Sequence, residues 1–416
     1  MPTAAGYATV AAMSNDHPRA RHDLEFIPFD HEGQPTILVR DRLEIVPWGT
    51  GIPQGLLPVL ALLDGRQSLA AVAAAVTEAQ GGRLVTAEDV AGLVAELDKA
   101  GLLDSPAYRE RKAAVAADFA AAPTRPTVFA GQAYPDTAAD LATYCDAVLA
   151  EAAPQARPAT APLAIIAPHI DPEAGRAGYA AAYAAIRGTA LKRVIVLGVG
   201  HQLMSGLYCL TDKPFATPLG DVATDAAAVA RLRRAGGTCL DPSELPHKAE
   251  HSIEFQAVFL RHGLAATPFA MVPVLCGSPV GILAESSRQA FLDYAGPFLA
   301  ELAALVREPG TLLVAGVDLC HIGGKFGHAE PAELLEDAAL SHDRALLAAL
   351  AAGDPEAFWA ESARVADNYN VCGLTALATL AEVLPPASMT LLSHDIMREA
   401  ATLSAVTFAA AAFTAR

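Results

Sequence analysis

Four segments in the C-terminal two thirds of this chain place an imidazole or a thiol at or just after an apolar run. They are LAIIAPH, VIVLGVGH, LLVAGVDLCH and NYNVCG, which carry His169, His201, His321 and Cys372. Continuous Val/Ile/Leu runs are typical of parallel strands buried on both faces, and open α/β sheets bind ligands beyond the carboxyl ends of such strands. We therefore expect these side chains to converge on one site.

A single histidine after a strand is more often a hydrogen-bonded structural residue than a ligand, so the whole set carries the interpretation. Gly and Pro beside these residues favour turns, and the glycines of GVGH would let the backbone approach a ligand closely. In an extended segment the side chains of Cys320 and His321 point to opposite faces, so Cys320 is not expected to bind the metal. The remaining cysteines are expected to be small buried hydrophobes, namely Cys145, Cys209, Cys239 and Cys276.

A further cluster lies in KAEHSIEFQAVFL, residues 248–260. On a helix, Glu250 and Glu254 lie one turn apart, and His251 shares a face with Glu254. In the structural alternative, the carboxylates only stabilise the N-terminal turn of an apolar helix by interacting with the helix dipole. The functional alternative makes His251 and Glu254 proton carriers, or groups that orient a metal-bound imidazole.

The elements that must position these residues read as an α/β domain with a largely parallel sheet and flanking helices. Helical patterns alternate with apolar runs, and the strands are expected near residues 163–168, 193–199, 270–275, 311–317 and 389–393.

The N-terminal part predicts a separate, smaller domain. Residues 1–36 show no periodicity and are expected to form an irregular lead segment. Residues 37–106 contain ILVRDRLEIVPW, a predicted strand pair, and then two helices capped by Ser68 and Thr86. This order is typical of a small winged helix, and residues 107–125 predict a linker helix that ends at Pro123.

The composition of the chain makes polyanionic partners unfavourable. The formal charge is −17 over 416 residues, which disfavours binding to nucleic acid or to an anionic membrane. The six cysteines form no CxxC pair and are expected to be reduced thiols. The first residues do not resemble a signal peptide, and ATLSAVTFAAAAF is too short to span a bilayer, so a cytoplasmic protein is expected.

The order FAGQAYP, APH, VGH, EHSIEFQ, DLCH and VCG over residues 128–373 resembles the Memo family, whose bacterial and archaeal members are called AmmeMemoRadiSam system protein B. The resemblance implies a LigB-like fold, that of the class III extradiol dioxygenases, over residues 126–416. It implies metal ligands at His169, His201 and Cys372. It also implies catalytic roles for His251, Glu254, Asp318 and His321. PHIDPEAG and GVGHQ depart from the family's PHAGY and GPSHH, which affects the expected substrate.

A second resemblance concerns residues 37–106. The stretches LLDGRQSLAAVAAAV and EDVAGLVAELDKAGLL resemble PqqD-like peptide-recognition domains, which implies a winged-helix domain that binds a peptide or a partner protein. A helical interaction module without a peptide ligand is the alternative.

Two imidazoles and a thiolate suit Fe(II), Cu or Zn, and the relation to iron-dependent dioxygenases favours Fe(II). The leading hypothesis is a mononuclear nonheme iron enzyme that uses O2 on a peptide or partner-delivered substrate. One alternative is an extradiol-type dioxygenase that acts on a small catechol. Another is a nonenzymatic metal- or peptide-binding scaffold for a radical-SAM partner.

Overall fold

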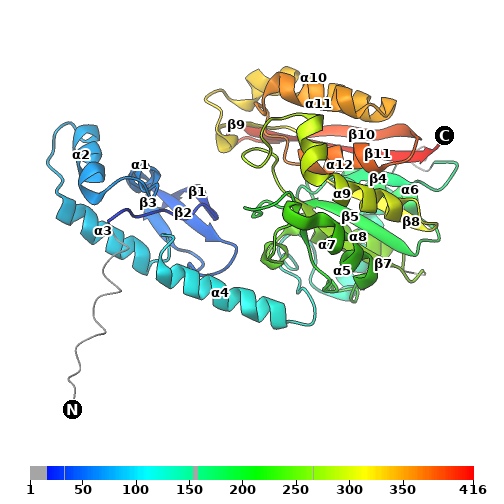
Figure 1. The fold of residues 1–416 in the computed structure, drawn as a ribbon, viewed down its shortest axis with the longest axis horizontal. Helices are drawn as coiled ribbons and strands as arrows, with labels where there is room; N and C mark the ends of the chain where they lie inside the picture. Colours follow the sequence, from blue (N-terminus) through cyan, green and yellow to red (C-terminus); the bar gives the residue numbers. More distant parts are fainter. Residues whose placement is uncertain (1–15, 32, 153–157, 266) are drawn as a thin grey trace, which may run out of the picture. The chain divides into compact units, whose positions relative to one another are not determined.

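The computed structural model describes residues 16–31, 33–152, 158–265 and 267–416 (Figure 1). The chain divides into two compact units, Met1–Ala121 and Ala122–Arg416. Each unit has its own core, and each is considered by itself below.

The N-terminal unit begins with an antiparallel sheet of β1 (Leu24–His31), β2 (Gln34–Asp41) and β3 (Gly51–Pro53), in the order β1-β2-β3. Strand β2 therefore pairs with β1 before it and with β3 after it, and the strand pair predicted within ILVRDRLEIVPW is not formed. The expectation of an irregular segment over 1–36 is wrong for β1, while residues 1–15 lie outside the described part of the chain. The charged residues and Pro28 of LEFIPFDH hide a strand whose Leu24 is buried with Ile37 and Val39.

Helices follow the sheet at the predicted starts. Ser68 Oγ accepts a hydrogen bond from the Ala71 amide at 3.3 Å, and Thr86 and Asp89 form a reciprocal capping box. Gly101, in the left-handed region at φ 78°, follows the second of these helices. The elements are η1 (Gln54–Leu56), α1 (Leu57–Leu62), α2 (Leu69–Ala79), α3 (Ala87–Lys99) and α4 (Pro106–Ala121). The assignment of this unit as a winged helix stays a prediction.

The C-terminal unit is an α/β domain (Figure 1). Its strands are β4 (Ala164–Ala167), β5 (Arg193–Val199), β6 (Tyr208–Leu210), β7 (Ala270–Cys276), β8 (Thr311–Gly316), β9 (His321–Gly323), β10 (Ala387–Glu399) and β11 (Ser404–Ala415). Its α-helices are α5 (Ala138–Ala150), α6 (Arg176–Ile186), α7 (Ala226–Gly236), α8 (His251–Gly263), α9 (Arg288–Val306), α10 (Ala332–Ala352), α11 (Pro355–Val365) and α12 (Leu374–Val383). The 3-10 turns are η3 (Gly237–Cys239), η4 (Leu245–His247) and η5 (Gly324–Phe326).

The strand order is β10-β11-β4-β8-β5-β7-β6, and β9 pairs with β11. The four central strands β4, β8, β5 and β7 are parallel, as predicted from their apolar runs. The outer strands are antiparallel, so the predicted strand near 389–393 belongs to an edge and not to the parallel centre. The sheet is therefore mixed.

Two apolar cores lie on the two faces of this sheet. Alternate residues of β5 show the division, because Ile195 and Leu197 pack with α7, α9 and α12, whereas Val194 and Val196 pack with α5, α6 and α8. The parallel strands are thus buried on both faces, which leaves their ends as the place for chemistry.

The six cysteines form no disulfide in the structure, as expected, and all except Cys372 are buried. Of the helices described, none combines the length and the apolar character that crossing a membrane requires.

A buried ion pair joins Arg21, which precedes β1, to Asp41 at the end of β2. The guanidinium of Arg21 donates to both carboxylate oxygens of Asp41, at 2.9 and 3.0 Å, and neither side chain is exposed. Asp41 also accepts the amides of Leu43 and Val46, at 2.9 and 2.8 Å. This carboxylate therefore joins the segment of Arg21 to the turn that follows β2.

We expect Asp41→Asn to destabilise the N-terminal unit by about 1–3 kcal/mol, because it removes the fully buried one of the two carboxylates that pair with Arg21 and leaves only Asp23. Hydrogen exchange of the β2 and α3 amides would measure the loss. The matched control is Glu25→Gln, whose partner Arg42 is partly exposed and whose loss should cost under about 1 kcal/mol. Equal effects of the two changes would show that the buried pair does not anchor this segment.

Candidate metal centre

Three imidazoles meet at the carboxyl end of the parallel strands. His169 follows β4, His201 follows β5, and His251 is the first residue of α8. One ring nitrogen from each lies within 4.8 Å of the others. Donors around a zinc-like ion sit about 2.0–2.3 Å from it, so nitrogens spaced this way can share one ion.

The carboxylate of Glu250 holds two of these rings. It lies 3.1 Å from Nδ1 of His201 and 3.1 Å from Nδ1 of His251, and it also accepts the backbone amides of His201 and Ser252, each at 3.0 Å. Burial alone would raise the pKa of Glu250, but the two histidines lower it well below its usual value. A carboxylate at Nδ1 favours the tautomer that presents Nε2 to a metal.

His169 is oriented by main-chain and carboxyl groups instead. Its Nδ1 lies 3.0 Å from the carbonyl oxygen of Gly316, and Asp318 accepts the amides of His169 and Ile170 at 3.0 and 3.1 Å. Burial lowers the pKa of His169 to about 4, outweighing the opposite effect of Asp318. This ring is therefore neutral at neutral pH, the form that binds a metal ion.

Cys372 lies beside the three histidines. Its Sγ is 3.7 Å from Nε2 of His169 and 3.7 Å from the carbonyl oxygen of Asp318. Burial, and after it the charge of Asp318, raise the pKa of the Cys372 thiol well above its usual value. The predicted trio of His169, His201 and Cys372 is thus brought together, but within the described residues the compact group of three has His251 in the place of Cys372.

Close backbone contacts set these positions. A Cβ on Gly198 would lie 2.5 Å from Cγ1 of Ile253, so glycine there lets α8 approach β5. A Cβ on Gly373 would lie 2.6 Å from Cβ of Val317, so glycine there lets the Cys372 turn reach the end of β8. The sequence predicted that the glycines of GVGH make room for a ligand. Gly198, the first of them, makes room for helix α8 instead.

Glu254, predicted to be a proton carrier, lies in a network of hydrogen bonds away from the three clustered imidazoles. Its carboxylate is buried and accepts hydrogen bonds from the Arg125 guanidinium, the Tyr134 hydroxyl and the amides of Val128 and Phe129. These donors fill its acceptor sites, so it anchors segment 125–134 to α8.

His321 has a different place from the three clustered histidines. Its Nδ1 lies 3.0 Å from the carbonyl oxygen of Leu319, and burial lowers its pKa. Together with His201 and Cys372 it lines a cleft of about 390 Å³ at the strand ends. The prediction that His321 acts as an acid or base is compatible with this position. Asp318, the other predicted catalytic residue, contacts His169 and positions it.

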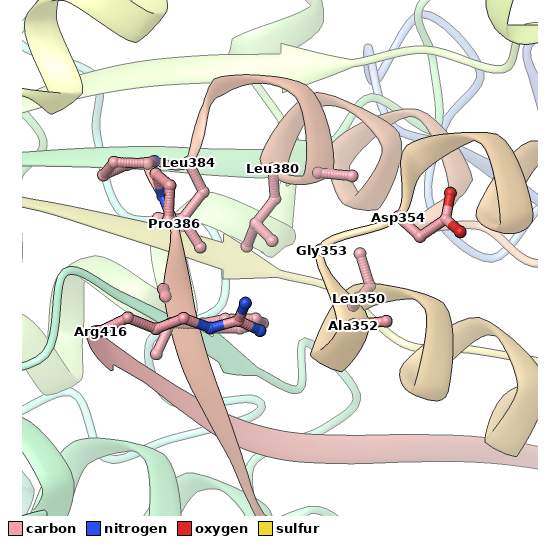
Figure 2. A pocket seen from close by; sticks show the side chains of 12 residues that line it. Leu350, Ala352, Gly353, Asp354, Leu380, Leu384, Pro386 and Arg416 are labelled. Carbon is pink, nitrogen blue, oxygen red and sulfur yellow. The ribbon is translucent and has the colours of Figure 1, made fainter.

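A second hollow, of about 240 Å³, lies between α10, α11, α12 and the end of β11. Figure 2 shows Leu350, Leu380 and Leu384 on its apolar side, with Asp354 and Arg416 as its charged groups. None of the described residues that line it is a His or a Cys, so it lacks the donors that gather at the strand ends.

Two groups that complete the site were not predicted as site residues. Glu250 could have been found from its position directly before His251, since a second carboxylate was already visible one turn from Glu254. The Gly316 carbonyl left no signal in the sequence, because any residue offers a carbonyl.

Comparisons with known proteins identify the family of the C-terminal unit. The model of the family described as Memo-like protein matches residues 125–412. A MEMO1 family protein of Thermus thermophilus is 28% identical over 327 residues, which cover 78% of this chain and 93% of that protein. A MEMO1 family protein of Aquifex aeolicus is 25% identical over 292 residues, covering 70% and 73% of the two chains. A similarity to the solved structure of an uncharacterized protein from Escherichia coli K12 covers 53% of this chain and 84% of that chain, at 16% identity and a TM-score of 0.33.

We expect Glu254→Gln to destabilise the C-terminal unit by about 3–5 kcal/mol, because Arg125 is fully buried and would lose its carboxylate. Chemical denaturation would measure this loss. The control is Glu301→Gln, which removes a half-exposed partner of Arg231 and should cost under about 1 kcal/mol. A Glu254→Gln protein of unchanged stability would restore Glu254 as a candidate proton carrier.

We also expect the metal-free protein to lose stability as the pH falls from about 6.5 to about 4. The unfolded chain takes up the His169 proton in this range while the folded chain excludes it, so stability is complete above the range and lost through it. The contribution is at most about 3 kcal/mol. Denaturation at about pH 7 and about pH 4 should show a smaller acid loss in His169→Asn than in the native protein. His262→Asn, outside the cluster, should keep the native loss, and an equal loss in all three proteins would contradict this assignment.

Proposed function

This chain belongs to the Memo-like protein family, and from that premise we propose that it is a mononuclear metal-dependent oxidoreductase. His169, His201 and His251 would hold the ion, and the Cys372 thiolate would be a further donor.

The prearranged imidazoles carry this proposal. Two rings share the Glu250 carboxylate and the third meets the Gly316 carbonyl, so all three Nδ1 atoms have a partner that orients the ring. Carboxylates and carbonyls at the outer nitrogen are the usual supports of metal-bound histidine. A purely structural histidine cluster would not require three rings to be turned toward one point.

The donor set and the family favour iron. Imidazole suits Fe, Cu and Zn, and a thiolate makes the set softer. The resemblance of the Memo family to LigB-like dioxygenases supports Fe(II), with Cu and Zn as the alternatives. A bound Fe(II) would supply one-electron chemistry with O2, which the side chains here cannot supply.

The remaining residues would act on the substrate and on protons. Burial lowers the pKa of His321, so its imidazole is neutral near pH 7. Because His321 lines the cleft, it could accept a proton from a molecule bound there. Asp318 fixes the backbone of His169 and acts as a positioning residue.

We expect protein purified without oxygen and supplied with Fe(II) to bind about one equivalent of metal, measured by elemental analysis. A variant with His169, His201 and His251 all changed to Ala should bind none, because it lacks the imidazole donors. His262→Ala, whose ring pairs with Asp146 outside the cluster, should bind as the native protein does. Failure to take up Fe, Cu or Zn, or an unchanged metal content in the triple variant, would refute the proposed centre.

Cobalt substitution separates the two candidate third ligands. A Cys372 thiolate bound to Co(II) gives a charge-transfer band in the near ultraviolet, which we expect in the native protein and not in Cys372→Ser. If Cys372→Ser abolishes binding while His251→Ala retains it, the ligands are His169, His201 and Cys372, as the family resemblance implied. Absence of the band in the native protein would remove Cys372 from the donor set.

A further inference from the structure

The cleft beside the histidines has a wall suited to an apolar molecule. Phe326, Val280, Pro279 and Leu374 line it, and the ring of Phe326 lies edge-on to His321 with centroids 4.9 Å apart. The inference below rests on the proposed function in taking this cleft as the place where substrate meets the metal centre.

The charged side chain among the described residues that line the cleft is acidic. Asp367 is its only carboxylate, and no Lys or Arg is found among the described residues that line it. Lys325, next to Phe326 in the chain, places its Nζ 2.8 Å from the carboxylate of Glu399 and so is already paired. In the metal-free protein, a phosphate or carboxylate would therefore find no Lys or Arg partner on these walls.

The loop that presents Asp367 is held firmly. Asn370 donates from Nδ2 to the carbonyl oxygens of His321 and Phe326, each at 3.2 Å, and the His321 amide donates to Tyr369 at 2.7 Å. These contacts tie the loop to the opposite wall of the cleft. The position of Asp367 is thus fixed relative to the apolar wall.

Asp367 lies at the exposed rim of the cleft, where His342 and the Val371 amide are the groups that favour its charged form. It adopts a left-handed backbone at φ 62°, which L-residues other than Asn, Asp and Gly seldom adopt. Burial raises its pKa, with the Val371 amide acting in the opposite direction. Within the described residues, no Lys or Arg forms an ion pair with it.

We propose that the cleft selects an amine: a molecule with an apolar, aromatic-sized body against Phe326 and a cationic ammonium group against Asp367. The body reaches His321 and Cys372 at the metal end, and the ammonium group supplies the charge that the lining lacks. In the metal-free protein the same carboxylate disfavours anionic analogues of the same size.

Three probes of one shape test this directly: 2-phenylethylamine, 2-phenylethanol and phenylacetate. Calorimetry on the full-length, metal-free protein should show the amine binding at least about fivefold more tightly than the alcohol, with phenylacetate weakest. The preference should shrink as salt is added, because an exposed ion pair is screened.

Asp367→Asn should bring the amine to within about twofold of the alcohol and leave the affinity for the alcohol unchanged, since Asn also suits a left-handed backbone. Glu330→Gln removes one charge from an exposed site outside the cleft and should keep the native preference. Equal binding of the three probes, binding of none, an amine preference that salt does not reduce, or an Asp367→Asn protein that still prefers the amine would each overturn the proposal.

The same titrations on zinc-loaded protein separate this inference from the proposed function. An amine preference in a protein that binds no metal would refute the metal centre and leave the cleft assignment intact. Metal uptake without an amine preference would refute the cleft assignment alone.

Discussion

The carboxylate of Glu250 is the contact on which the candidate centre depends. It joins two imidazoles that reach it from different elements, His201 from the end of β5 and His251 from the start of α8. It also caps α8 through the amide of Ser252. A buried carboxylate is costly unless its oxygens are hydrogen-bonded, and here the groups that satisfy it are those that must be aligned. Stabilising the fold and orienting the metal ligands are therefore one interaction.

Helix α8 extends this principle along its first two turns, because each polar side chain there ties down a different part of the site. Ser252 Oγ donates to the Val199 carbonyl at 2.8 Å, just before the His201 turn. Gln256 Nε2 donates to the Pro168 carbonyl at 2.9 Å, just before His169. Glu254 fixes segment 125–134. The helix thus sets the ends of β4 and β5 relative to each other, which explains why EHSIEFQ is rich in polar residues that are nonetheless buried.

Period and spacing predicted the central strands and the histidines at their ends, since both follow from local pattern. They could not tell Glu250 from Glu254, because two carboxylates one turn apart are equivalent on an isolated helix. Their partners, His201 and Arg125, come from segments far away in the chain. For the same reason His251 was predicted to carry protons or to orient a metal-bound imidazole, and not to be one of the clustered rings, although its ring lies with His169 and His201. The first strand was missed because charge and Pro28 mask its alternation.

The protonation states of the metal-free site form a consistent set. Burial lowers the pKa of His169 to about 4 and raises that of the Cys372 thiol, so both side chains are held in their neutral forms near pH 7. A neutral imidazole is ready to bind a cation, whereas a thiol must first lose its proton. The histidines would therefore capture the ion, and the positive charge they bring beside Cys372 would lower the cost of its ionisation. In the proposed centre the imidazoles would hold the ion, and the Cys372 thiolate would be the donor that is added at the cost of losing its proton.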